Sequence, residues 1–283
     1  MSDWPPPASR LQPAPPAPPS LQWRPLAGPL AAQQLGSPDA PRVVFVHGFT
    51  QTGNSWKPIA ERFVALGYQA VVVDLPGHGG STHVRSDLRR TADGIAAAGG
   101  VATYIGYSLG GRACLHLALM YPHLVASLVL IGAHPGIADA DERARRREAD
   151  DQLAARMQEI GLEAFLKEWT ALPLFGGFVP GPDDIADRLH NTEDGLASSL
   201  RMAGTGEQGS LWPRLMELNM PVLAIAGADD AKFIAIAQQI AEAVPEGECR
   251  IVAGAAHAAH LQQPEAVAAA ITTALRPRPD ELG

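Results

Sequence analysis

The stretch TYIGYSLGGR, residues 103–112, decides the fold of this chain. The apolar run up to Gly106 predicts a buried strand, and the residues from Gly110 onward predict a helix. Ser108 stands between them in the pattern G-x-S-x-G, which in this context indicates a strained turn that exposes a nucleophilic serine. The alternative is a chance match in a glycine-rich chain, and the flanking strand and helix weigh against it.

Strands and helices alternate on both sides of this motif, which predicts an α/β fold. Several of the strands are apolar throughout rather than at every second residue, a pattern typical of a mostly parallel sheet that helices cover on both faces. Strands are expected at 42–48, at the start of 68–81, and at 101–106, 126–133, 220–227 and 249–254, and helices at 85–98, 110–122, 232–243 and 264–275.

The segment 136–212 breaks this alternation, because it holds charged helical stretches and no strand-like run. We expect it to form a helical cap over the carboxyl-terminal edge of the sheet, with the Gly- and Pro-rich residues 175–184 as an entrance loop. The proline content of residues 1–20 predicts a disordered tail. The expected organisation is a tail at 1–20, the first part of the core at 21–135, the cap at 136–212, the second part of the core at 213–276 and a C-terminal tail at 277–283.

The composition of the chain limits the kinds of molecule that it is expected to bind. The chain has 283 residues, 46% hydrophobic content and a net charge of −8, which argues against nucleic acid and anionic membranes as partners. No apolar run approaches the roughly 18 residues of a membrane span, so no integral membrane association is expected. The N-terminus lacks the pattern of a secretory signal, and we expect a cytoplasmic protein. Cys114 and Cys249 are expected to be free thiols, no residue cluster suggests a metal, and the oligomeric state cannot be read from the sequence.

A serine hydroxyl needs a base, and the base needs an orienting acid. In this topology both follow the serine, in the order Ser, Asp, His. His257 comes soon after the last predicted strand and is our candidate base, whereas we expect His260 to be a packing or capping residue. Asp230 is our candidate acid, with the neighbouring Asp229 left open because the register is uncertain by one residue.

The same reasoning predicts a site for negative charge, an oxyanion hole. The backbone N–H of Leu109, at the start of the helix after the serine, is one candidate donor. Phe49, in the loop after the strand at 42–48, is the candidate for the second. His47 and His78 are expected to tether loops rather than to take part in the chemistry.

Taken together, these motifs resemble the α/β-hydrolase fold superfamily over roughly residues 40 to 276. The blocks GYSLGGR, ERARRREADDQLA, GLEAFLKEWTALPLF, PVLAIAGADDAKF and HAAHLQQPE are also similar to those of one subfamily. That subfamily is the 2-succinyl-6-hydroxy-2,4-cyclohexadiene-1-carboxylate synthases of menaquinone biosynthesis. Because the blocks cover the cap as well as the core, the resemblance is more specific than the serine motif alone.

The resemblance implies a lyase that uses no cofactor. In this family the Ser–His–Asp set removes a proton from a small anionic substrate, and pyruvate is eliminated. Arginines bind the substrate carboxylates, and the matching positions here are Arg112, Arg146 and, with a less certain alignment, Arg188. Tyr107 and Trp169 are expected to line the pocket.

Two other classes of function remain open. With the same triad, Ser108 could act as the nucleophile of a serine hydrolase on an ester, thioester or carbon–carbon bond of a small carboxylated compound. A non-catalytic binding module on this fold is the other alternative, and the presence of Ser108, Asp230 and His257 argues against it.

Overall fold

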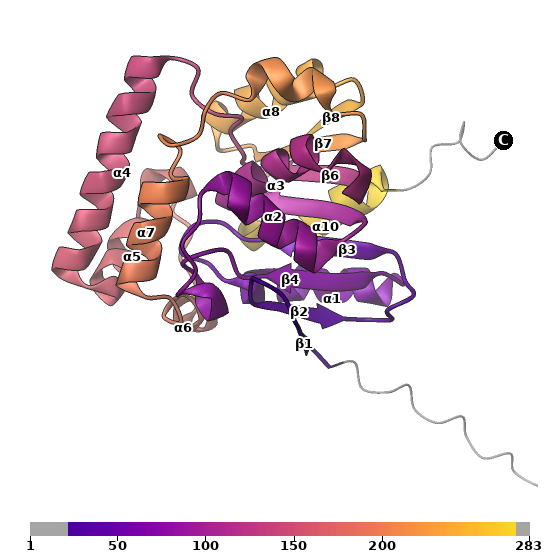
Figure 1. Ribbon diagram of the computed structural model, residues 1–283, viewed down its shortest axis with the longest axis horizontal. Coiled ribbons are helices and arrows are strands. Elements are labelled where there is room, and N and C mark those ends of the chain that lie inside the picture. The colour runs from indigo at the N-terminus through magenta and orange to yellow at the C-terminus, as the bar shows by residue number, and fades with distance from the viewer. Residues whose placement is uncertain (1–21, 276–283) are drawn as a thin grey trace, which may run out of the picture.

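The computed structural model describes residues 22–275, and the strands in this range form one eight-stranded sheet (Figure 1). The strand order is β1-β2-β4-β3-β5-β6-β7-β8. The pairs β1–β2 and β2–β4 at one edge are antiparallel, and every other neighbouring pair is parallel, which confirms the predicted mostly parallel α/β sheet. The strands are β1 (Arg24–Leu26), β2 (Ala32–Leu35), β3 (Arg42–Val46), β4 (Gln69–Val73), β5 (Ala102–Tyr107), β6 (Val125–Ile131), β7 (Val222–Gly227) and β8 (Gly247–Val252).

Helices cover both faces of this sheet, and this explains why its central strands are apolar on every residue. On one face α2 (Leu88–Gly99), α3 (Leu109–Met120) and α8 (Ala231–Ala243) contribute buried side chains to one large core cluster. On the other face α1 (Lys57–Ala65) and α10 (Pro264–Ala274) close a second cluster. β4 and β5 are buried along their whole length between these two layers.

Four helices form the segment between β6 and β7. They are α4 (Ala140–Ile160), α5 (Leu162–Thr170), α6 (Pro182–Arg188) and α7 (Glu193–Ala203). Figure 1 shows them gathered beside one end of the sheet, with α4 outermost. α4, α5 and α7 share a small apolar cluster of their own, which includes Met157, Phe165 and Leu196. The cap therefore has its own core and presents its inner side to the site described below.

Short helices complete the described chain. They are α9 (Ala259–Gln262) and the 3-10 turns η1 (Gly53–Trp56), η2 (Gly79–Ser81), η3 (Pro122–Leu124), η4 (Pro173–Phe175) and η5 (Trp212–Glu217). None of the helices between residues 22 and 275 is long and apolar enough to cross a bilayer. Cys114 and Cys249 are free thiols.

The structure differs from the sequence prediction in several places. The strands β1 and β2 and the helix α1 were not predicted. The stretch expected as an entrance loop at 175–184 is shorter, because Phe175 ends η4 and α6 begins at Pro182. Proline is favoured in the first turn of a helix, so a Pro-rich stretch can contain a helix start. The tails expected at 1–20 and 277–283 lie outside the described residues.

Candidate active site

Ser108 occupies a strained turn between β5 and α3. Its backbone has φ 50° and ψ −108°, a conformation that residues with a Cβ rarely adopt. Its N–H donates to Ile131 O at 2.8 Å, and its carbonyl accepts from Arg112 N at 3.0 Å, so both sides of the residue are held. A Cβ at Gly110 would lie 2.3 Å from the Val46 carbonyl oxygen, so only glycine allows α3 to start this close to β3.

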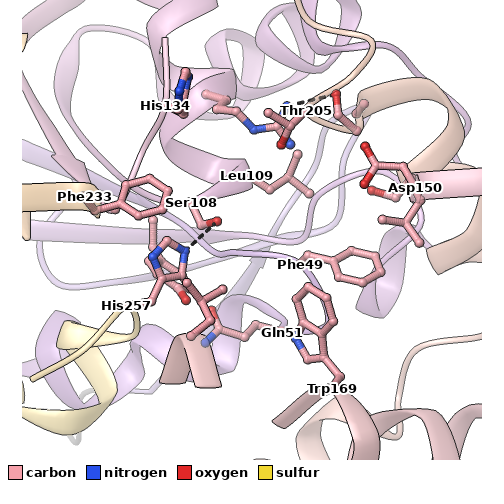
Figure 2. Close-up of a pocket in the computed structure, with 18 of the residues that line it drawn as sticks. Phe49, Gln51, Ser108, Leu109, His134, Asp150, Trp169, Thr205, Phe233 and His257 are labelled. Carbon is pink, nitrogen blue, oxygen red and sulfur yellow. Dashed lines mark hydrogen bonds between the residues drawn. The ribbon is translucent and has the colours of Figure 1, made fainter. Parts of the chain in front are cut away.

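The structure brings Ser108, His257 and Asp230 together in a hydrogen-bonded row. His257 Nε2 lies 3.3 Å from Ser108 Oγ, the contact drawn as a dashed line in Figure 2, and His257 Nδ1 lies 3.0 Å from Asp230 Oδ2. Asp230 is buried and also caps α8, since its Oδ1 accepts from Phe233 N at 3.2 Å. The neighbouring Asp229 is exposed. Asp230 is therefore the carboxylate that meets the imidazole.

The two amides expected to form an oxyanion hole are available. Within residues 22–275, neither Phe49 N nor Leu109 N donates to an acceptor of the protein. Leu109 is the first residue of α3, so its N–H lies at the positive end of the helix dipole. Thr50, next to Phe49, has φ 68°, and Gln51 Oε1 accepts from Gly48 N at 3.1 Å, which holds the turn of this loop.

Buried histidines support this loop from behind. The N–H of Leu75 donates to His47 Nε2 at 2.9 Å, so the ring proton is on Nδ1, which donates to Gly48 O at 2.8 Å. The bond that Nε2 accepts needs a neutral ring, and burial lowers the pKa of His47 to about 4. His78 packs edge-on against His47 at 5.0 Å between ring centroids, and burial lowers its pKa to about 3. Both histidines therefore hold loops in place, as we expected.

His260 is a packing residue in this geometry. It lies in α9, and its ring is sandwiched between Trp56, at 4.5 Å, and Tyr107, at 4.2 Å between centroids. Burial, with the positive charge of Arg188 acting in the same direction, lowers its pKa well below the ordinary value. The ring therefore stays neutral and packs against the Tyr107 ring.

Core and cap together enclose a cavity of about 240 Å³ in front of Ser108. On the cap side, Trp169 meets the Phe49 ring edge-on, at 5.1 Å between centroids. Figure 2 shows Ser108 and His257 facing this space, with Phe49 and Trp169 across from them. Every residue that we predicted for the site except Asp230 lines this cavity, namely Phe49, Tyr107, Ser108, Leu109, Arg112, Arg146, Trp169, Arg188 and His257.

Arg112 is a buried cation of the cavity, with 7% of its surface exposed. Its Nη1 donates to Gly204 O and to Gln208 Oε1, both at 3.3 Å, so both of its acceptors in the described chain are uncharged. Burial lowers its pKa to about 10, and the positive charge of Arg146 acts in the same direction. The guanidinium is thus charged at neutral pH but lacks an anionic hydrogen-bond partner in this part of the chain.

Arg146 is held by a buried carboxylate. Its Nε donates to Asp150 Oδ1 at 2.9 Å, one helical turn along α4, and Asp150 is 4% exposed. Asp150 Oδ2 also accepts from Gly206 N at 3.3 Å, which ties α4 to the segment after α7. The other arginines of this run do not line the cavity: Arg143 donates to Ile137 O at 2.9 Å, Arg147 pairs with Glu207, and Arg145 is exposed.

Arg188 enters the cavity from α6 and is 5% exposed. Its Nε pairs with Asp184 Oδ2 at 2.9 Å, and its Nη1 donates to Thr50 Oγ1. This contact connects α6 of the cap to the loop that carries the Phe49 amide.

Some lining residues were missed by the sequence analysis. They are Gln51, His134, Asp150, Lys232 and Phe233. His134 follows β6 closely, and Lys232 and Phe233 follow Asp230 at the start of α8. Residues that follow the carboxyl ends of parallel strands gather at one edge of the sheet, and this rule could have found His134, Lys232 and Phe233, but not Asp150. In the described part of the chain, no group of three His, Cys, Asp or Glu side chains is clustered as a metal site would require.

Comparison with known proteins assigns this chain to a family. A family model described as the alpha/beta hydrolase family matches residues 43–270. A Bacillus subtilis protein provisionally named 2-succinyl-6-hydroxy-2,4-cyclohexadiene-1-carboxylate synthase is 37% identical over 238 residues, which are 78% of this chain and 85% of the relative. An Escherichia coli protein of the same name is 32% identical over 87% of this chain and 98% of the relative.

Solved structures agree with this placement. The structure of MenH from S. aureus is 28% identical and superposes with a TM-score of 0.78, covering 89% of this chain and 99% of that one. A thermophilic esterase from Thermogutta terrifontis, 23% identical with a TM-score of 0.77 over 90% and 98% of the two chains, shares the fold. The chain therefore belongs to the alpha/beta hydrolase family and, within it, to the family of the 2-succinyl-6-hydroxy-2,4-cyclohexadiene-1-carboxylate synthases.

Proposed function

We propose that this enzyme is a cofactor-independent lyase of menaquinone biosynthesis, which eliminates pyruvate from a succinyl-cyclohexene carboxylate precursor. The observation that carries the proposal is the meeting of Ser108 with guanidinium groups in one cavity. Among the described residues Arg112 has no anionic hydrogen-bond partner, and a buried guanidinium of this kind is unfavourable in the empty protein and becomes favourable when a carboxylate binds. An enzyme for neutral esters has no need of such a group.

In the proposed mechanism, the row of Asp230, His257 and Ser108 acts as the base. Asp230 holds His257 in the tautomer with the proton on Nδ1, so that Nε2 can accept the proton of Ser108 Oγ. The serine oxygen then removes a proton from a substrate carbon instead of attacking a carbonyl. The electrons of that C–H bond form the new double bond of the ring, and the C–O bond to the leaving group breaks. The departing enolpyruvate takes up the proton held on His257 and becomes pyruvate, while the proton from the substrate restores the Ser108 hydroxyl.

The amides of Phe49 and Leu109 stabilise the charge in this step. As the proton leaves, negative charge develops on the conjugated carboxylate of the substrate. The N–H groups of Phe49 and Leu109 have no acceptor in the described chain. They can therefore donate hydrogen bonds to that oxygen without any rearrangement of the protein.

Arg112, Arg146 and Arg188 bind the carboxylates, and the aromatic rings exclude water. Guanidinium groups match carboxylates with two parallel hydrogen bonds, which fixes both position and orientation. Tyr107 and Trp169 line the same space, and Trp169 closes it from the cap together with Phe49.

The available amides also suit acyl transfer, so a serine hydrolase of a small carboxylated compound is the second candidate. Intact-protein mass spectrometry with an activated ester separates the two functions. A hydrolase would form an acyl-Ser108 species and turn it over rapidly. We expect the lyase to acylate slowly, and to release pyruvate from the pyruvate-bearing precursor. A lack of pyruvate release together with fast acyl turnover would reject the lyase assignment.

A further inference from the structure

One wall of the cavity has no role in the proposed mechanism. His134 follows β6, and Lys232 and Phe233 open α8, yet all three line the cavity that contains Ser108. Figure 2 shows His134 and Phe233 on one side of Ser108, and Asp150 and Trp169 on the other. The wall therefore lies on the other side of Ser108 from Asp150 and Trp169.

His134 offers a hydrogen-bond donor at this wall. The N–H of Gly136 donates to His134 Nδ1 at 2.9 Å, so in the neutral ring the proton is on Nε2. Burial, with the positive charges of Lys232 and Arg112 acting in the same direction, lowers the pKa of His134 to about 4, and the ring is neutral at physiological pH. Among residues 22–275 no acceptor takes the Nε2–H, and the atom is not sealed from solvent.

The backbone at His134 is also held in place. Its backbone oxygen accepts from Gln208 Nε2 at 3.5 Å, and Gln208 Oε1 accepts from Arg112. The Leu211 N–H donates to Pro135 O at 2.7 Å, which fixes the chain directly after His134. A donor fixed in this way can select the position of a substrate oxygen.

Lys232 adds a positive charge beside this donor. Within the described chain its ammonium has no carboxylate within ion-pair distance, and it lies 5.9 Å from the centroid of the Phe233 ring. Arg146 and Arg188 are paired with Asp150 and Asp184, so they differ from Lys232 in this respect. An ammonium and an N–H donor with no anion of their own are a suitable pair for one carboxylate.

We infer that His134 and Lys232 form a further anion subsite, and that it holds the carboxylate of the departing pyruvate. The inference rests on the proposed function. The product of the relatives, by its name, keeps a ring carboxylate and a succinyl carboxylate, and pyruvate brings a third. Arg112 and Arg188 are buried and suit the groups that stay, whereas Lys232 is exposed and suits a fragment that leaves toward solvent. The subsite only binds, and takes no part in proton transfer.

Three ligands test this assignment, because they differ in the carboxylates that they carry. The precursor carries the ring, succinyl and pyruvate carboxylates. The cyclohexadiene product lacks the pyruvate carboxylate, and pyruvate carries only that group. The measurements are KM for the precursor and the inhibition constants of product and pyruvate. The variants are Lys232→Met and His134→Asn, because asparagine keeps an acceptor for Gly136 N but lacks the Nε2–H. The matched control is Lys57→Met on α1, which removes the same charge from a lysine that lies over Trp23 at 5.3 Å.

We expect Lys232→Met to raise KM and the inhibition constant of pyruvate roughly tenfold each. His134→Asn should weaken both in the same direction, and both variants should leave the inhibition constant of the cyclohexadiene product unchanged. Equal weakening of product and pyruvate would overturn the assignment to the leaving carboxylate. No change with any ligand, or a change as large in Lys57→Met, would overturn the subsite.

The proposed function is tested separately by the wild-type enzyme, because a wild type that releases no pyruvate rejects that function before any variant is compared. Binding of pyruvate can then be measured without turnover, as protection of Ser108 from labelling by a fluorophosphonate. If pyruvate protects the wild type and the Lys57→Met control but not Lys232→Met, the subsite stands without the lyase. If all three are protected equally, or none is, the subsite is rejected.

Discussion

Replacement of Arg112 by methionine should weaken catalysis without weakening the fold. Burial lowers the pKa of the Arg112 guanidinium to about 10, which means that burial of the charge costs roughly 3 kcal/mol at neutral pH. As pH rises, Arg112 loses its proton in the folded protein before it does so in the unfolded chain. Its charge therefore lowers the free energy of unfolding by this full amount at pH values below 10. Methionine removes the cost but leaves Gly204 O and Gln208 Oε1 without their donor, at about 1 kcal/mol each.

The expected free energy of unfolding of the Arg112→Met protein is therefore unchanged or about 1 kcal/mol higher. A charge-assisted hydrogen bond to a substrate carboxylate contributes roughly 1.5–3 kcal/mol, so kcat/KM for the precursor should fall about tenfold to a hundredfold. Hydrolysis of a small neutral ester should not change. Urea unfolding measures the free energy of unfolding, and steady-state kinetics measure kcat/KM for the precursor and for the ester.

Arg42→Met is the control, because Arg42 binds Gln69 Oε1 and Gly99 O, both at 2.8 Å, outside the cavity. We expect that variant to lose about 1–2 kcal/mol of stability and no activity. An Arg112→Met protein that loses activity equally on both substrates, or loses as much stability as the control, would refute this account of Arg112.

Further predictions follow from the same geometry. Asp230→Asn should lower kcat on the order of 10³ to 10⁴-fold, because the imidazole loses its orienting carboxylate, whereas Asp229→Asn should have no effect on kcat; equal effects would exclude Asp230 as the orienting acid. Gly132→Ala should lower kcat about tenfold in a folded protein, as judged by circular dichroism, since the new Cβ would lie 2.9 Å from His257 Cε1 at φ 55°. The free energy of unfolding should fall as pH drops below about 6.5, because the buried histidines, His47 among them, take up their protons first in the unfolded chain; His47→Gln, which keeps an acceptor for the Leu75 N–H, should reduce this slope between about pH 6.5 and 4, and an unchanged slope would contradict the account.

Local chemistry explains why much of the fold could be predicted. Residues 103–112 combine an apolar strand, a glycine that lets two backbones meet and a helix, and each of these is a property of the segment itself. β1 could not be predicted in this way, because it has three residues, one of them Pro25, and two of the three are exposed. Such a strand forms only because β2 offers an edge for it to pair with.

The candidate site shows the same division between local and tertiary information. The positions of Ser108 and His257 follow from strand ends in a parallel sheet. Asp150 stands in a charged helix whose sequence is typical of a solvated face, and it becomes buried because the segment at Gly206, far along the chain, packs over it. The spacing of Arg146 and Asp150 on one helix is compatible with an ion pair, but the packing of Gly206 that buries this pair cannot be read from the sequence, and neither can the contact of Arg188 with Thr50 on the oxyanion loop.

The most direct test of the central claim is the rate of pyruvate release from the pyruvate-bearing precursor, followed with lactate dehydrogenase and NADH in the presence of a chelator. The account predicts rapid release by the wild type, with one cyclohexadiene product formed for each pyruvate, and no release above background by Ser108→Ala. Wild-type protein that releases no pyruvate, or a Ser108→Ala protein that releases it at the wild-type rate, would contradict the account.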